Sequence, residues 1–217
     1  MKFKGAVGLC YALLFALLSS LAWAGNFAAL TIRPFGAQAF DLSTGVTTLA
    51  DGGSVIDLEN NVRMQGTFIR YLEGSFVELH EAEAEGSFGV LQAGLLHLDL
   101  ETLVISASAE VRLQSDTTID VQAESVHIHL SPDIAVVRGE VRGVAPQLQG
   151  ASMLVDMAQR QALLIGPYHY NDGPVTLRSQ REGELLSLQW GDAEAEGLVA
   201  STNVAEAMRS RLLAYLH

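Results

Sequence analysis

Four side chains with metal-binding chemistry recur in two similar stretches of the chain. His97 and Asp99 lie in the first stretch, and His127 and His129 occupy the equivalent positions thirty residues later. If the two stretches form adjacent strands in register, His97 lies beside His127 and Asp99 beside His129, about 4.8 Å apart, and both residue types are ligands for zinc or copper. All four nevertheless fall on the polar face of an alternating pattern, and nothing identifiable would orient the imidazoles. We therefore expect no bound metal.

Sequence motifs of common enzymes are absent. The chain has no Gly-x-Ser-x-Gly elbow, no His-Glu-x-x-His motif, no glycine-rich phosphate loop and no dinucleotide fingerprint. The segment HEAEAEG at 80–86 lacks the second histidine of a zinc protease and alternates like a strand, with its glutamates solvated and its alanines facing inward. A glycosidase would need two carboxylates facing each other across a cleft, whereas the acids are scattered between Asp41 and Glu206. We expect no catalytic residues and no cofactor.

The elements that carry these residues are strands, because apolar and polar side chains alternate with a period of two. The inward-facing residues of three similar segments would form one broad apolar surface: Leu96, Leu98, Leu100, Val126, Ile128, Leu130, Met153, Val155 and Met157. Two interpretations of this surface remain open. It is either the ordinary core of a closed roll or, if one seam is open, a trough that shields acyl chains at about 0.8 kcal/mol per buried methylene. These nine residues are the candidate lipid-binding residues.

The chain is built from repeats. Gln92–Arg112 and Gln122–Arg142 align without a gap, and 153–166 aligns with 126–139 at a spacing of 27. A unit of this length holds two strands of roughly six to eight residues and two turns, and it can cover its apolar face only by stacking on its neighbours. We therefore predict an all-β roll of stacked antiparallel strands, in which Leu98 and Ile128 lie on adjacent strands or one rung apart.

The two ends of the chain depart from this pattern. Residues 1–24 have the layout of a secretory signal, with an uncleaved membrane anchor as the alternative. Cleavage would leave 217 − 24 = 193 residues, enough for one roll domain at 25–201. Residues 202–217 are expected to form a C-terminal amphipathic helix, capped by Asn203 with Glu206 three residues later. We expect this helix to plug the open apolar end of the roll, and a helix that docks on a partner or on a membrane surface is the alternative.

The charge of the chain narrows the choice of partners, and its cysteine content excludes disulfides from the predicted domain. Both lysines precede residue 25, so the remaining chain has 13 − 2 = 11 basic residues, all arginine, against 25 acids, a formal charge of −14. Such a surface repels nucleic acid and anionic membranes. The chain's one cysteine, Cys10, lies in the predicted signal, so disulfides cannot stabilise the domain although it is expected to fold outside the cytoplasm.

A segment near the start of the predicted roll domain resembles part of a known protein family. Ala37–Gly66, AQAFDLSTGVTTLADGGSVIDLENNVRMQG, is similar to the opening rung of OstA-like proteins, the periplasmic lipopolysaccharide-transport components. The match is carried by Phe40-Asp41 and by NNVRMQG at 60–66, and Gly139–Gly143 repeats its second half. The resemblance extends over about residues 25–170, with looser similarity to about residue 201.

The resemblance implies an open V-shaped β-roll in the periplasm. Members of this family hold acyl chains in the groove and join end to end, which implies lipopolysaccharide or another acylated envelope lipid as ligand, and other β-roll transport proteins or a second copy of the chain as partners. Two features depart from the family pattern, namely the C-terminal helix and an acidic surface without lysine. The identity of the bound lipid therefore stays open between lipopolysaccharide and another envelope lipid. A closed β-solenoid serving a structural or adhesive role in the cell envelope is the alternative.

Overall fold

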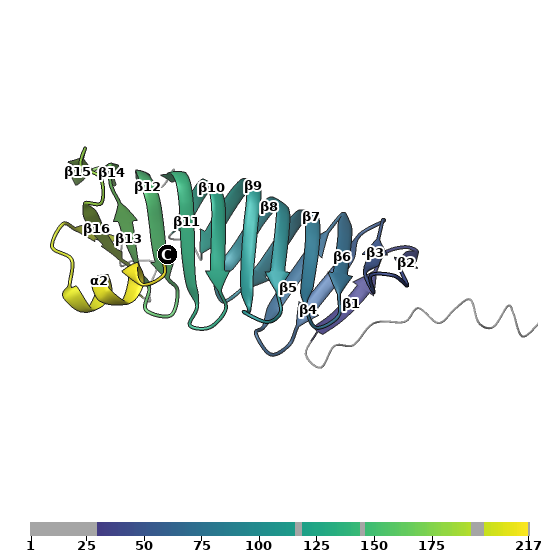
Figure 1. Cartoon of the computed structure of the whole chain (residues 1–217). Coiled ribbons are helices and arrows are strands. Elements are labelled where there is room, and N and C mark those ends of the chain that lie inside the picture. The colour runs from purple at the N-terminus through teal and green to yellow at the C-terminus, as the bar shows by residue number, and fades with distance from the viewer. Residues whose placement is uncertain (1–29, 116–118, 144–145, 192–197, 217) are drawn as a thin grey trace, which may run out of the picture.

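The structure of the protein is a computed structural model that describes residues 30–115, 119–143, 146–191 and 198–216. These residues form one antiparallel β-sheet and one short helix (Figure 1). The strands before the central region are β1 (Leu30–Pro34), β2 (Gln38–Phe40), β3 (Thr47–Leu49), β4 (Gly53–Asp57), β5 (Val62–Gly66) and β6 (Phe68–Leu72). The central strands are β7 (Phe76–Gly86), β8 (Gly89–Asp99), β9 (Val104–Ser115), β10 (Ile119–His129), β11 (Ile134–Gly143) and β12 (Gln147–Asp156). They are followed by β13 (Gln161–Ile165), β14 (Tyr168–Asn171), β15 (Thr176–Ser179), β16 (Leu185–Gln189), β17 (Val199–Ser201) and α2 (Glu206–Leu213). The predicted fold class, an open all-β roll of stacked antiparallel strands with one C-terminal helix, is confirmed.

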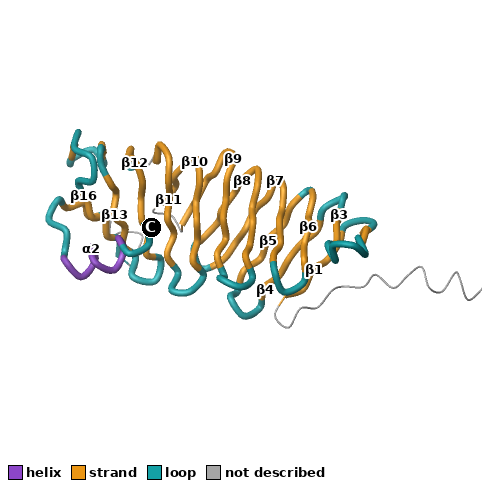
Figure 2. Tube along the Cα trace, viewed as in Figure 1, coloured by secondary structure: helices purple, strands orange, loops and turns teal. Residues whose placement is uncertain are grey.

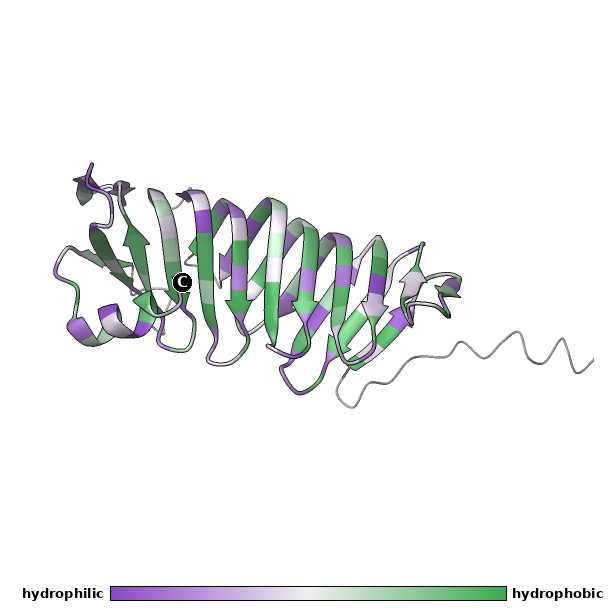
Figure 3. Ribbon diagram, viewed as in Figure 1, coloured by the Kyte–Doolittle hydropathy of each residue, from purple (hydrophilic) through white to green (hydrophobic). Residues whose placement is uncertain are grey.

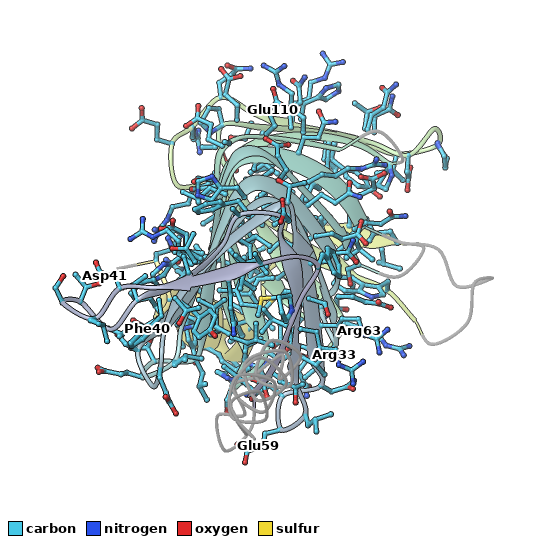
Figure 4. The ribbon with its side chains drawn as sticks, turned by 90° about the vertical axis from the view of Figure 1, so that its right-hand side faces the viewer. Arg33, Phe40, Asp41, Glu59, Arg63 and Glu110 are labelled. Atoms are coloured by element: carbon cyan, nitrogen blue, oxygen red, sulfur yellow. The ribbon has the colours of Figure 1, made fainter. Side chains whose placement is uncertain are left out.

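The sheet bends into two walls that meet at a crease, as the view along the roll shows (Figure 4). Wall A contains β2, β3, β6, β13, β16 and β17 together with residues 76–80, 95–99, 104–108, 125–129, 134–138 and 152–156. Wall B contains β1, β4, β5, β14 and β15 together with residues 82–86, 89–93, 111–115, 119–123, 141–143 and 147–150. We call the side opposite the crease, where the free ends of the walls face each other, the mouth.

The crease is made by bulges in the central strands. Pairing shifts register in the middle of β8, β10 and β11. The residues with positive φ at this level are Glu81, Ala109, Glu110, Gly139 and Glu140. A bulge bends a strand and strengthens its twist, so each long strand crosses from one wall to the other. Each repeat unit holds two strands, as predicted, but the predicted length of six to eight residues was wrong, because β7 to β12 are bent strands of 10 to 12 residues.

The turns at the free end of wall A stack on one another through backbone hydrogen bonds (Figure 2). The Leu130 amide donates to the Leu103 carbonyl at 3.1 Å, and the Met157 amide donates to the Asp133 carbonyl at 3.1 Å. Leu103 and Asp133 both have left-handed backbones, with φ of 55° and 69°. The hydrogen-bonded rungs therefore continue beyond the strands into the turns.

The core lies between the two walls, and the colours of the strands alternate accordingly between apolar and polar (Figure 3). Wall B contributes Phe88, Leu91, Val111, Leu113, Ile119, Val121, Val141 and Leu148, all buried. The predicted alternation of segment 80–86 is confirmed, because Ala82 and Ala84 are buried and the neighbouring glutamates are exposed. Burial of these apolar columns is the main source of stability available to a cysteine-free domain.

The C-terminal helix lies on the outside of wall A rather than at an end of the roll. Met208 and Leu212 of α2 pack in a second apolar cluster against residues of β11, β12 and β13, including Val136 and Leu154. The prediction that the helix plugs the apolar end of the roll was therefore wrong. The helix also begins later than expected, at Glu206, and its cap residue Ala205 makes no side-chain capping bond.

Candidate functional site

The nine candidate lipid-binding residues all lie on the inner face of wall A. Six of them are completely buried: Leu96, Leu98, Val126, Ile128, Met153 and Val155. Met157 is 8% exposed, and Leu100 and Leu130 are partly buried at the edge of the core. The structure thus brings all nine together in one apolar cluster that faces the inner residues of wall B.

The repeat spacing places these residues in rows across the sheet. Leu98 pairs with Ile105 of β9, and Ile105 pairs with Ile128 of β10. Leu98 and Ile128 are therefore one rung apart in the same row, as predicted, with roughly twice the strand spacing of about 4.8 Å between them. Each repeat therefore adds further apolar side chains to the same row.

Side chains from both walls meet at the mouth. The Ser115 hydroxyl of wall B lies 3.4 Å from the Met157 sulfur of wall A. Asp133, in a wall A turn, is half-buried; burial raises the pKa of its carboxyl, and the Ser87 hydroxyl of wall B lowers it in part. One oxygen of Asp133 is buried without a hydrogen-bond partner among the described residues. The two walls are thus in contact at the mouth through side chains.

The histidine and aspartate cluster is more widely spaced than the sequence suggested. His97 pairs with Ser106, and Ser106 pairs with His127, so β9 separates the two histidines. The placement of His97 and Asp99 directly beside His127 and His129 was therefore wrong, because successive repeats are two strands apart rather than one. The Asp99 carboxylate instead accepts hydrogen bonds from the amides of its own turn. In the part of the chain that the structure describes, no group of three or more potential ligands is placed to hold a metal ion.

His127 and His129 lie beneath the C-terminal segment. The ring of Tyr215 packs edge-on against His129 at 5.0 Å, and Arg138 donates a hydrogen bond of 2.9 Å to the Leu216 carbonyl. Burial lowers the pKa of His127, and the charges of Arg138 and His129 lower it further. The Nδ1 atom of His127 is buried with no hydrogen-bond partner within the described ranges. Burial also lowers the pKa of His129.

An ion pair fixes the helix to the same face. Arg211 of α2 pairs with Asp156, a fully buried carboxylate that also accepts hydrogen bonds from the Gln159 amide and the Gln161 side chain. Sequence reasoning missed this surface. Its signal was the loss of alternation in IAVV at 134–137 and ALLI at 162–165, since strands covered on both faces are apolar throughout.

The outer surface has a shallow hollow of about 780 Å³ at the crease. Its floor is formed by small residues such as Ala82, Ala93 and Gly94, and its rim includes Phe35 and Glu110. This hollow lies on the opposite side of the sheet from the candidate lipid-binding residues.

Comparison with protein-family models finds no match, and comparison with curated proteins finds none either. The predicted signal at 1–24 lies outside the described residues. No helix within the described ranges has the length and apolar character needed to cross a membrane.

Proposed function

We propose that the protein is a periplasmic lipid carrier, without enzymatic activity, that shields acyl chains of lipopolysaccharide or a related envelope lipid during transport to the outer membrane. The observation that carries the proposal is the apolar lining between two walls of one open sheet. Strand pairing joins the described parts of the walls at the crease, and side chains join them at the mouth. Parting the mouth would expose the lining without breaking the strand ladders.

The resemblance of Ala37–Gly66 to OstA-like proteins supports the same proposal. The open V-shaped roll is the architecture that this resemblance implies, and the nine inner residues would be the ones that contact acyl chains. Replacing packed side chains by an acyl chain keeps the lining out of water, because the chain supplies apolar contacts of the same kind.

End-to-end partners are part of the proposal. Phe40 of β2 is a large apolar side chain that is exposed at the β2 end of the roll (Figure 4). Phe35, Leu42 and Leu58 are exposed as well, and they lie in the connections between β1 and β2, β2 and β3, and β4 and β5. Among the described strands, β1, β2, β15 and β17 each pair with one neighbour, so both ends have strand edges that another roll or a second copy could extend.

A closed structural roll is the second candidate. It is favoured by the complete burial of residues such as Ile128 and Val155 and by the contact between Ser115 and Met157 across the mouth. In that case the interior is a core like any other, and lipid has no effect on stability.

Two matched substitutions separate the candidates. Val155 faces the interior, and Val136 lies under α2 on the outer face, and the side chains of both are almost completely buried. Val→Ala at either position should cost roughly 1 to 3 kcal/mol through the cavity that it leaves. A lipid that binds only the folded protein raises the unfolding midpoint by mass action.

We expect a palmitoyl lipid to raise the midpoint of the parent protein and of Val136→Ala equally, and that of Val155→Ala by less. A midpoint that lipid leaves unchanged in all three proteins would favour the closed structural roll.

A further inference from the structure

The mouth is lined by aliphatic side chains from successive turns of wall A. Leu100, Leu130 and Met157 each come directly after the last residue of a wall A strand, at the second position of a repeated turn. Leu100 and Leu130 are partly exposed there, whereas the candidate residues deeper between the walls are buried. An acyl chain that approaches the roll from this side therefore meets apolar surface before it reaches the core.

One of the side-chain contacts between the walls at this point is weak. A hydroxyl group and a thioether sulfur form a poor hydrogen bond, because sulfur is a weak acceptor, and Ser115 and Met157 are joined in this way. The neighbouring Asp133 has a buried oxygen without a partner among the described residues, which makes the closed arrangement costly there. Opening the mouth at this point would let water reach that oxygen.

An acyl chain that entered from an end of the roll would face a different obstacle. It would have to pass between fully buried side chains of consecutive rungs, such as Leu98, Ile105 and Ile128, and displace each row in turn. Close-packed interiors resist such insertion. Parting the mouth over one or two rungs disturbs fewer rows.

We propose that acyl chains enter the interior sideways, through the mouth at Leu100 and Leu130, and that the contact between Ser115 and Met157 must part to admit them. The proposal rests on the lipid-carrier function and specifies how its binding site is reached.

The test is to lock the mouth with a covalent link. Ser115→Cys and Met157→Cys are introduced into the chain with Cys10→Ser, so that these are its only two thiols, and the thiols are joined by a short bifunctional cross-linker. The probe is palmitate carrying a polarity-sensitive fluorophore, and its rate of uptake is measured before and after linking. We expect rapid uptake by the unlinked protein and loss of uptake once the mouth is linked.

The matched control joins two strands within wall A. Ser106 and His127 are opposite each other on the outer face of β9 and β10, so a link between Ser106→Cys and His127→Cys does not cross the mouth. This protein should take up the probe at the parental rate. Circular dichroism confirms that both linked proteins are folded.

The outcomes distinguish the two proposals. Equal uptake by the linked and unlinked mouth variants overturns sideways admission and leaves the carrier function standing. Failure of the parent protein to take up the probe overturns both. Since Met157→Cys removes buried volume, Met157→Ala provides a second measurement without a link: uptake should become faster, and unchanged or slower uptake would count against the proposed contact.

Discussion

The two faces of wall A have different roles, and single residues determine them. Inner residues such as Val155 line the interior, whereas Val136 and Asp156 on the outer face hold α2. Asp156 is completely buried, which is costly for a carboxylate unless it is paired, and Arg211 supplies the charge that it needs. The C-terminal helix is thereby fixed in one position on the wall.

The histidines beneath the C-terminal segment predict a dependence of stability on pH. Burial lowers the pKa of both His127 and His129 from an ordinary value near 6.5. The folded protein therefore binds fewer protons than the unfolded chain just below pH 6.5, so these residues make folding less favourable as the pH falls. The groups that face them are Arg138, Tyr215 and Ser106, and the first of these adds repulsion once an imidazole is charged.

We expect the denaturant midpoint to fall between pH 7.5 and pH 5.5, and to fall less in the double variant His127→Asn with His129→Phe. The phenylalanine keeps a ring against Tyr215 but cannot titrate. An identical pH dependence in parent and double variant would show that these two histidines do not contribute.

At the scale of elements, the turns and the crease determine how strands become walls. Gly52 and Gly74 provide a matched pair, because their φ angles are 74° and 71°. A Cβ on Gly52 would lie 2.2 Å from the Gly66 carbonyl oxygen, whereas a Cβ on Gly74 would have nothing within 4 Å. Gly74→Ala should therefore cost only the left-handed backbone penalty of roughly 1 to 2 kcal/mol. Gly52→Ala should cost clearly more, since the backbone of the neighbouring strand must move.

Urea unfolding of the two variants checks this prediction. Equal losses in the free energy of unfolding would mean that β4 and β5 can separate at this point without cost.

The strands and their inner faces could be predicted from the sequence because a period of two reports directly which side chains share a face. The crease could not, because several of its positive-φ residues are Glu or Ala rather than glycine. Neither residue signals a bulge by its type. The predicted neighbour relations of the histidines were wrong for a different reason: each repeat contributes two strands, so β9 lies between His97 and His127.

The position of α2 was predictable in part. The runs at 134–137 and 162–165 indicate strands covered on both faces, but nothing in them specifies which segment provides the cover. The expectation of an amphipathic helix within 202–217 was sound, since Met208 and Leu212 lie one turn apart and are its buried residues. Their contacts with Val136 and Leu154 depend on the course of the whole chain.

On the scale of the whole molecule, a polar acidic exterior surrounds a continuous apolar interior. The formal charge of the chain is −12 at pH 7, and its only lysines are Lys2 and Lys4. Anionic headgroups near the mouth would be repelled by this charge, and salt would screen the repulsion. Binding of acyl chains inside the roll should depend much less on salt, because it comes from the burial of apolar surface.

Lipid mass spectrometry on the full chain, purified from a cell envelope without detergent, tests the central claim most directly. The account predicts that an acylated lipid remains bound to the parent protein and to Val136→Ala, and that Val155→Ala retains less of it. A parent protein that carries no lipid after this purification, and whose unfolding midpoint does not change when a palmitoyl lipid is added, would contradict the carrier function.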